Sequence, residues 1–228
     1  EKSKISLAEK NTILSGITFT AVIDHCKADL VIEAIIEKED AKVDLFTKLT
    51  AINSSHCIFA SNTSSLSINA LQKRIQNPER VAGMHFFNPA QIMKLVEVVK
   101  GEHTSDATAQ TLMDICRQLK KVPVLCKDAP GFIVNRVARH YYLEAMHLVE
   151  NNMASIETVD ELMEASGFKM GPFKLMDLIG MDINLAVSQS LYEAFNEEPR
   201  FKPSAIQIKK VKDGELGKKT GKGFYQYN

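Results

Sequence analysis

Two residues that can carry a proton, His85 and Glu97, stand in a segment, residues 80–101, that is otherwise strongly apolar. An unpaired carboxylate in apolar surroundings costs several kcal/mol or gives up its charge, so such a glutamate needs a partner close by. An imidazole held by a carboxylate is the arrangement of a general base, because the carboxylate fixes the tautomer and stabilises the imidazolium. We interpret the pair as a proton-transfer site, although a hydrogen-bonded core histidine is the commoner meaning of such a pair taken alone.

Polar side chains that can bind a substrate occur at two further places. Residues 61–68, SNTSSLSI, end one expected strand and open a helix, which places their hydroxyl groups and the Asn62 amide at the carboxyl edge of a sheet. Ligands of open α/β folds bind at this edge. Asn135 follows the Pro130-Gly131 step, one turn into the first helix of a second domain. We expect both groups to face a cleft between the domains.

The spacing of apolar residues predicts the elements that position these groups. In the first half of the chain, short β-branched runs alternate with stretches of helical periodicity. The expected strands are residues 17–20, 29–35, 57–61, 80–86, 95–101 and 122–127, and the expected helices are residues 38–52, 67–75 and 105–121. This alternation predicts an α/β fold with a largely parallel sheet. Residues 29–35 lack polar alternation, which predicts a strand covered on both faces.

From Gly131 onward the pattern is helical. The expected helices are residues 132–152, 155–167, 173–195 and 204–214. Ser155 is suited to begin a helix and Gly167 to end one. The chain therefore divides into an α/β domain, residues 1–127, and an all-α C-terminal domain, residues 128–228.

Composition argues against several classes of partner. The 28 lysines and arginines balance the 28 aspartates and glutamates, so no overall field recruits nucleic acid or an anionic membrane surface. No apolar run reaches the roughly 18 to 20 residues that span a bilayer, and the first residues show no signal-peptide hydrophobic region, which predicts an intracellular protein. The four cysteines lack metal-ligand spacing, so we expect no metal. The lysine-rich residues 209–223 leave two meanings open, a solvated turn or a contact with an anionic ligand.

Five segments follow one another in the order and at the separations typical of the 3-hydroxyacyl-CoA dehydrogenase family: SNTSSL, GMHFFNPAQIMKLVEVV, KDAPGFIVNR, MGPFKLMDLIG and GKKTGKGFYQY. The resemblance covers essentially the whole chain. It implies an NAD-binding Rossmann-type domain followed by a helical domain, with NAD as cofactor and an acyl-CoA as substrate. The implied reaction oxidises an L-3-hydroxyacyl-CoA to the 3-oxoacyl-CoA, as in fatty acid β-oxidation, in the cytoplasm or, in a eukaryote, in the mitochondrial matrix or peroxisome.

The resemblance also implies a homodimer formed through the helical domain, for which the apolar segments 141–149 and 187–195 are the expected contacts. It assigns further roles residue by residue. His85 is the base and Glu97 its orienting partner, while Ser64 and Asn135 hold the substrate oxygens. The positions expected to line the dinucleotide are Glu37, Lys42, Ser64, Asn88 and Lys219. Lys219 would give the lysine-rich segment an anionic ligand.

One expected feature of the family is absent from these 228 residues. A Rossmann-type domain opens with a strand, a G-x-G-x-x-G loop and a helix, and no such motif occurs here. A parallel sheet without those strands has an unpaired edge. We therefore expect a partial Rossmann-type domain, with the first strands and the phosphate loop lying upstream in the natural protein.

Two other classes of function stay open. A serine hydrolase would use Ser64, His85 and Glu97, but the G-x-S-x-G elbow that presents such a serine is absent. A non-catalytic helical dimerisation module would leave the α/β part without chemistry. Reduction of NAD in the presence of a 3-hydroxyacyl-CoA distinguishes the dehydrogenase from both.

Overall fold

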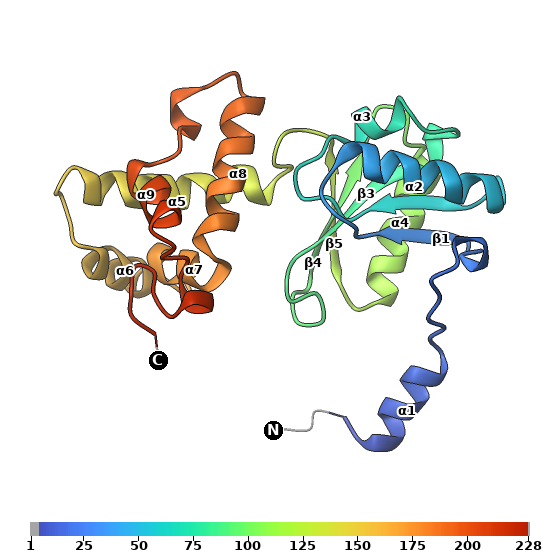
Figure 1. The fold of residues 1–228 in the computed structure, drawn as a ribbon, viewed down its shortest axis with the longest axis horizontal. Helices are drawn as coiled ribbons and strands as arrows, with labels where there is room; N and C mark the ends of the chain where they lie inside the picture. The colour runs from blue at the N-terminus through green and yellow to red at the C-terminus, as the bar shows by residue number, and fades with distance from the viewer. Residues whose placement is uncertain (1–4, 228) are drawn as a thin grey trace.

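The protein folds into two lobes, whose residues 5–227 are described by a computed structural model (Figure 1). A five-stranded sheet and its flanking helices form one lobe, and helices α5 to α9 form the other. The N-terminal end of α5, Val134–Glu150, leads from the sheet lobe into the helical lobe (Figure 1). None of the described helices is long and apolar enough to cross a membrane.

The strands lie in the sheet in the order of the sequence. They are β1, Leu30–Glu33; β2, Ile58–Ser61; β3, Val81–Phe86; β4, Leu95–Lys100; and β5, Val122–Lys127. Strands β1, β2 and β3 are parallel, β3 and β4 are antiparallel, and β4 and β5 are parallel again. The antiparallel step matters for the site because it pairs β3 and β4 residue by residue.

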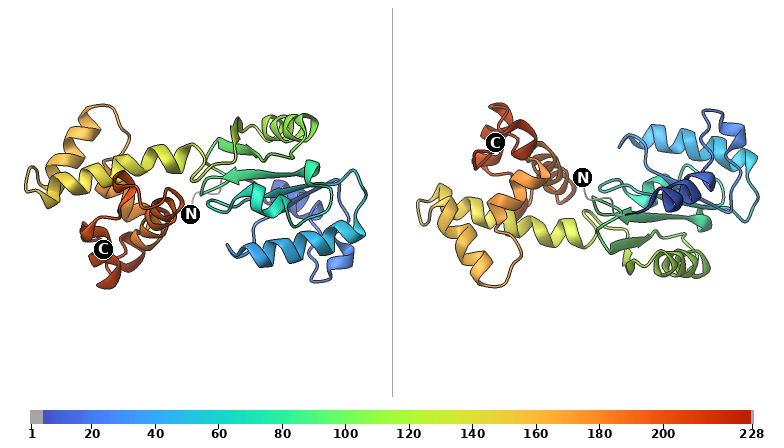
Figure 2. Two further views of the ribbon diagram at one scale, coloured as in Figure 1. Left: turned by 90° about the horizontal axis from the view of Figure 1, so that it is seen from above. Right: turned by 90° about the horizontal axis from the view of Figure 1, so that it is seen from below.

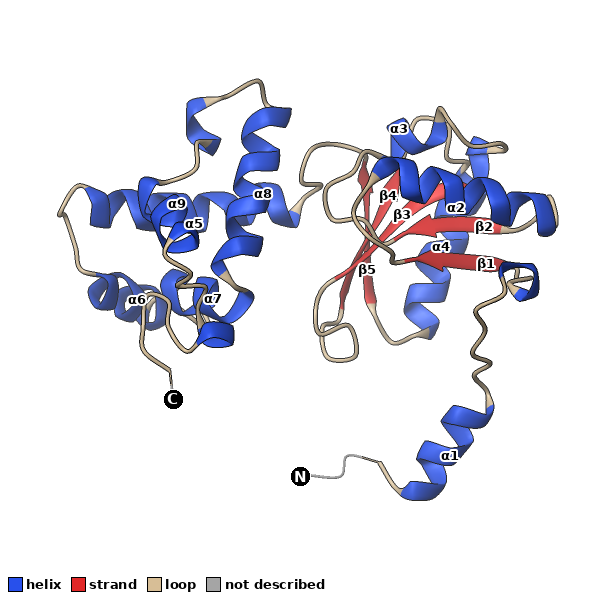
Figure 3. Ribbon diagram, viewed as in Figure 1, coloured by secondary structure: helices blue, strands red, loops and turns tan. Residues whose placement is uncertain are grey.

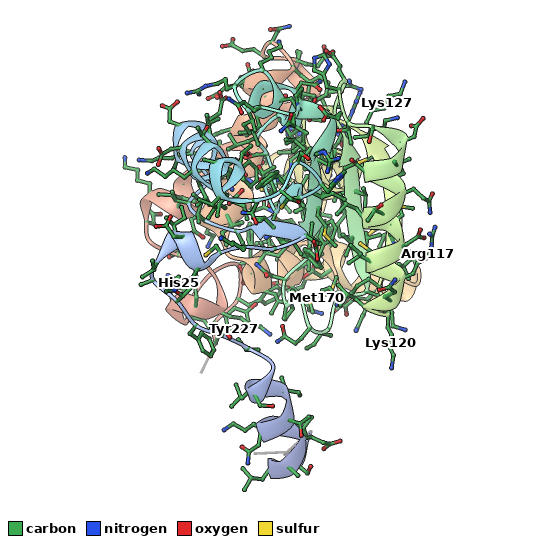
Figure 4. The ribbon with its side chains drawn as sticks, turned by 90° about the vertical axis from the view of Figure 1, so that its right-hand side faces the viewer. His25, Arg117, Lys120, Lys127, Met170 and Tyr227 are labelled. Atoms are coloured by element: carbon green, nitrogen blue, oxygen red, sulfur yellow. The ribbon has the colours of Figure 1, made fainter. Side chains whose placement is uncertain are left out.

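Helices cover both faces of the central strands, which explains the continuous apolar sequences of these strands. The helices of this lobe are α1, Leu7–Ser15; α2, Glu39–Ile52; α3, Ile68–Gln72; and α4, Asp106–Gln118. Helices α2 and α4 lie on opposite faces of the sheet (Figure 2). Phe46 of α2 packs edge-on against Phe59 of β2, and on the other face Leu112 of α4 packs with Met84. Strand β5 runs back along α4, so that Lys127 lies at the opposite end from Lys120 (Figure 4).

The helical lobe is built on its own core, and its helices are shown in blue in Figure 3. They are α5, Val134–Glu150; α6, Ile156–Ala165; α7, Pro172–Ile179; α8, Met181–Ala194; and α9, Ala205–Lys212. Phe173, Met176 and Met181 pack together with residues of α5 and are fully buried. The carboxylate of Asp160 accepts hydrogen bonds from the amides of Phe173 and Lys174, which fixes the start of α7 against α6.

The structure confirms the predicted α/β domain followed by an all-α domain, and it confirms a largely parallel sheet. Five of the expected strands form. The expected strand at residues 17–20 is wrong, because these residues are exposed and pair with no strand among residues 5–227. The expected cover on both faces of residues 29–35 is also wrong for Ile32, which is 43% exposed on the edge strand β1.

Two helix predictions also need correction. Residues 173–195 form two helices instead of one, because Gly180 takes a left-handed backbone (φ 103°) that ends α7 and starts α8. Helix α1 was not expected from its apolar spacing, and none of its residues is buried. Its signal lies in a capping box, in which Ser6 and Glu9 bond each other's backbone amides.

Candidate active site

The antiparallel register of β3 and β4 places His85 directly opposite Glu97. Residues opposite each other on neighbouring strands share a face of the sheet, so the two side chains meet. Nδ1 of His85 lies 2.8 Å from Oε2 of Glu97, and both side chains are buried. A carboxylate only accepts, so Nδ1 carries the hydrogen of this bond. The predicted contact between the two residues therefore exists.

The second oxygen of Glu97 binds the other lobe. Oε1 accepts hydrogen bonds from the backbone amides of Ile133 and Val134, each at 2.9 Å, at the start of α5. Burial is the strongest single influence and favours the protonated acid, but the hydrogen bonds from His85, Val134 and Ile133 together outweigh it and hold the pKa of Glu97 below its usual value. Glu97 is thus an ionised, fully hydrogen-bonded carboxylate between the two lobes.

Aromatic rings enclose the imidazole of His85. The ring centroids of Phe87 and Phe132 lie 4.6 Å and 5.7 Å from that of His85. Its second nitrogen, Nε2, has no hydrogen-bond partner among residues 5–227. This nitrogen is therefore free to accept a proton from a bound molecule, while Nδ1 is engaged with Glu97.

Ser64 and Asn135 also meet where the sheet lobe joins the helical lobe. The side-chain amide of Asn135 donates to the backbone oxygen of Ser64 at 3.4 Å. Glu37 fixes the loop that carries Ser64. Its Oε1 accepts hydrogen bonds from the amides of Ser64 and Ser65 and from the hydroxyl of Thr63. Burial favours the acid form of Glu37, but the bond from Thr63 and the charge of Lys42 outweigh burial, so the pKa of Glu37 is lowered. The Ser64 hydroxyl makes no hydrogen bond within the described chain, which leaves it free for a ligand.

Lys42 belongs to a buried ion network at the carboxyl end of β1. Its ammonium lies 2.6 Å from Glu33 and 3.1 Å from Glu37, and its side chain is 1% exposed. The other oxygen of Glu33 accepts from the hydroxyl of Ser61 at 2.6 Å. Ser61 belongs to the segment 61–68 that the sequence placed at this edge, whereas Glu33 was not predicted as part of the site. A glutamate within the apolar run DLVIEAI carried the same signal that pointed to Glu97, because a buried carboxylate needs a partner.

The two remaining candidates lie apart from this network. Asn88 is exposed in the loop after β3, on the same edge of the sheet as Ser64. Lys219 lies on the short 3-10 turn Lys218–Thr220 of the helical lobe, where its ammonium pairs with Asp182 at the start of α8. Their contact with a dinucleotide stays a prediction, as it does for Glu37, Lys42 and Ser64.

A pocket of about 330 Å³ lies between the lobes, and none of the predicted site residues lines it. Ser65, Ser67 and Asn69 line it from the segment after β2, and Ser190 and Ala194 line it from α8. Hydroxyl and amide groups at a joint between two domains are the setting in which polar ligands commonly bind. The expected cleft between the domains is therefore confirmed for the segment that follows β2.

The sheet lobe and the helical lobe each have a known counterpart. Residues 1–129 match the sequence model of the 3-hydroxyacyl-CoA dehydrogenase NAD binding domain, and residues 131–227 match that of the 3-hydroxyacyl-CoA dehydrogenase C-terminal domain. A 3-hydroxyadipyl-CoA dehydrogenase of Escherichia coli is 49% identical over 96% of this chain and 46% of its own length. The mitochondrial hydroxyacyl-coenzyme A dehydrogenase of Sus scrofa is 45% identical over 94% of this chain and 68% of its own length.

A solved structure gives the same result. The crystal structure of 3-hydroxybutyryl-CoA dehydrogenase from Escherichia coli superposes with a TM-score of 0.94 at 44% identity, covering 99% of this chain and 48% of that one. Fold and site together define a two-domain protein with a Rossmann-type, NAD-binding sheet domain. The chain belongs to the 3-hydroxyacyl-CoA dehydrogenase family. It spans slightly less than half the length of the Escherichia coli relative and of the chain in the Escherichia coli crystal structure.

The residues present fit one end of NAD. The free Ser64 hydroxyl and the exposed Asn88 amide lie at the carboxyl edge of the parallel strands and can bond a polar ring substituent or a ribose. A pyrophosphate needs a glycine-rich turn at the start of a helix. Within residues 5–227 no strand is followed by such a turn, so these residues offer groups for a ribose or a ring substituent and none of this kind for the pyrophosphate.

Proposed function

We propose that this protein carries out the NAD-dependent oxidation of an L-3-hydroxyacyl-CoA to the 3-oxoacyl-CoA. The observation that carries the proposal is the His85–Glu97 pair, with Nδ1 of His85 bound at 2.8 Å and Nε2 unpartnered within the described residues. Membership of the 3-hydroxyacyl-CoA dehydrogenase family supports this reaction over the two alternatives. A serine hydrolase is further disfavoured because no hydrogen bond joins Ser64 to His85 among residues 5–227.

The proposed mechanism assigns each group one task. Nε2 of His85 takes the proton of the 3-hydroxyl group, and Glu97 stabilises the imidazolium that forms. The Ser64 hydroxyl and the Asn135 amide hold the reacting oxygen through its change of charge. Bound NAD supplies the hydride acceptor, and Glu37, Lys42, Asn88, Ser64 and Lys219 are the groups proposed to hold it. The same residues carry the reverse reaction, in which the imidazolium polarises a 3-oxo group.

Replacing the base tests the proposal. We expect the whole enzyme to reduce NAD, followed at 340 nm, when it is given an L-3-hydroxyacyl-CoA. His85→Gln should lower kcat by about 10²- to 10⁴-fold, the usual share of general-base catalysis, with acyl-CoA affinity within about tenfold. A variant that keeps half the wild-type rate contradicts the assignment. Labelling of the wild type by a serine-reactive phosphonate, without any NAD reduction, would support the hydrolase instead. Absence of both NAD reduction and labelling would support the dimerisation module.

We further propose a homodimer formed through the helical lobe. The expected contacts at residues 141–149 need correction, since Tyr142, Leu143 and Met146 of this segment are buried inside the lobe. In residues 187–195, Ser188 and Leu191 are buried in the same way. The proposed face consists instead of three exposed apolar side chains at the α7–α8 corner, Leu178, Ile179 and Ile183.

The dimer proposal has a direct test. We expect light scattering to give twice the chain mass for the wild type and the mass of a single chain for Ile183→Glu, because a carboxylate in an apolar interface is costly. Glu102→Gln, a change on the exposed loop after β4, should leave the mass unchanged. A dimeric Ile183→Glu variant would show that the interface lies elsewhere on the protein.

We propose the cytoplasm as the compartment, or the mitochondrial matrix or peroxisome in a eukaryote. The mitochondrial relative supports this proposal.

A further inference from the structure

We infer that the backbone amides of Ile133 and Val134 are positioning groups through which the helical lobe sets the strength of the Glu97–His85 hydrogen bond. The inference rests on the proposed function for its kinetic part only. Both amides bind Oε1 of Glu97, while His85 binds Oε2, so one carboxylate is shared between the two lobes. Donors on one oxygen withdraw charge from the other, so the two amides compete with the imidazole for Glu97.

The start of α5 is suited to this task. Amides in the first turn of a helix lack partners within the helix, and the helix end carries a partial positive charge. Hydrogen bonds from such amides to an ionised carboxylate are roughly twice as strong as those between neutral groups. Ile133 caps α5 without any side-chain hydrogen bond of its own. Glu97 therefore supplies the acceptor that a capping side chain would otherwise provide.

The backbone of Gly131 and Phe132 directs the amides toward Glu97. Both residues have left-handed backbone angles, with φ of 71° and 48°. Glycine adopts such angles freely, whereas for a phenylalanine they are strained, because its Cβ comes close to a carbonyl oxygen. The strain is sustained by packing, since the Phe132 ring is buried beside His85. A side chain at position 131 would also collide with Leu191 of α8. Packing of both lobes thus fixes the turn that aims the two amides.

The same turn of α5 also reaches the substrate side of the site. Asn135, the next residue, bonds the backbone oxygen of Ser64. Within residues 5–227, Glu97 receives hydrogen bonds from His85 and from the two amides, and from no other charged or titratable side chain. His85 approaches from β3, and the thiol of Cys126 on β5 is neutral, because burial first and then the nearby Glu97 and Asp128 raise its pKa to about 12. A shift of the helical lobe would therefore alter the base pair and the Ser64 contact together.

Amide-to-ester replacement in the whole enzyme tests the inference, because it removes one N–H and keeps the side chain. Val134 is replaced by 2-hydroxy-3-methylbutanoic acid, and Ile133 by its hydroxy-acid analogue in a second variant. The control is the same replacement at Val137, whose amide bonds Ile133 O inside the helix and not Glu97. Proton NMR of the ligand-free enzyme follows the Hδ1 resonance of His85, and kcat and KM are measured separately.

We expect both test esters to move the Hδ1 resonance downfield, because Glu97 becomes a stronger acceptor for His85. We expect kcat to fall by about tenfold to 10²-fold through misplacement of the base, with KM within about threefold. The Val137 ester should leave the resonance and kcat unchanged. Folded test esters with unchanged Hδ1 and kcat would overturn the inference.

Two outcomes separate this inference from the proposed function. A displaced Hδ1 resonance in an enzyme that reduces no NAD would keep the positioning role and reject the dehydrogenase. If the esters do not fold, Glu97→Gln gives the test, because loss of the ionised acceptor should move the amide proton resonances of Ile133 and Val134 upfield. Unmoved amide resonances in that variant would refute the inference.

Discussion

Two buried glutamates in the sheet domain have partners of different kinds. Glu33 bonds the ammonium of Lys42, and Glu97 bonds the imidazole of His85. A lysine side chain keeps its charge at neutral pH, whereas an imidazole gains and loses a proton near this pH. The first pair joins β1 to α2. The second is able to change its charge during a reaction, which is why chemistry is assigned to it.

At the same scale, Glu97→Gln should disable the base without unfolding the protein. The amide oxygen of glutamine still accepts from Ile133 and Val134, so its NH₂ group faces Nδ1 of His85. Nδ1 must then accept, which leaves the hydrogen on Nε2 and blocks proton uptake there. We expect kcat to fall by about 10²-fold or more, and the acidic limb of the rate profile to move to lower pH, because the charge that stabilises imidazolium is gone.

Kinetics of NAD reduction between pH 5 and pH 9 measure both effects. The matched control is Glu102→Gln, which removes an exposed carboxylate from the loop after β4 and should keep the wild-type profile. If Glu97 had a structural role alone, the variant would unfold at a lower temperature while its plateau rate and acidic limb stayed in place.

Among the elements, the C-terminal segment depends on a close approach to α7. The carboxylate of Asp177, buried in α7, accepts from the amides of Phe224 and Tyr225 and from the hydroxyl of Tyr227. These bonds require Gly223, where an added Cβ would collide with the Asp177 carboxylate. The motif GKKTGKGFYQY therefore fixes the last segment of the chain to the helical core, whatever ligand its lysines bind.

Gly223→Ala should lower the free energy of unfolding by about 1–3 kcal/mol, the usual cost of overpacking. Chemical denaturation followed by circular dichroism measures this difference. The control is Gly214→Asn, since Gly214 has a left-handed backbone and open space around it, and asparagine tolerates that backbone. We expect the control to stay within about 0.5 kcal/mol of the wild type. Equal losses at both positions would show that the cost at Gly223 does not come from the contact with Asp177.

In the whole molecule, Glu97 makes the joint between the lobes sensitive to acid. Its pKa in the folded protein is lower than the usual 4.5, so on acidification the unfolded chain takes up a proton before the folded protein does. Proton uptake by the unfolded form lowers stability as pH falls. The contribution of Glu97 should be complete above about pH 5 and should disappear as pH drops below 4.5 toward the folded value.

Urea unfolding at a series of pH values tests this sign. Below about pH 4.5, the usual value for a glutamate, the difference in unfolding free energy between the wild type and Glu97→Gln should shrink as the solution is made more acidic, because glutamine does not titrate. A difference that grows over this range would show that Glu97 is protonated more readily in the folded protein than in the unfolded chain.

The sequence by itself determined the order of domains, five of the strands and the pairing partners Glu97 and His85. These features depend on local periodicity and on the rule that a buried charge needs a partner, and both can be recognised in a short segment such as residues 80–101. Local pattern also drew attention to the segment of Ser64, which follows an expected strand, and to Asn135, in the first turn of an expected helix.

Only the tertiary structure decided how these residues meet. The antiparallel register that sets His85 opposite Glu97 depends on pairing between strands, which apolar spacing does not encode. The contacts of the Ile133 and Val134 amides cannot be predicted from side-chain types, because every residue except proline has a backbone amide. Only the fold decides which amides face a carboxylate. The same reason explains why the Lys42–Glu33 pair appeared only in the folded chain, where packing of α2 against β1 brings the two side chains together.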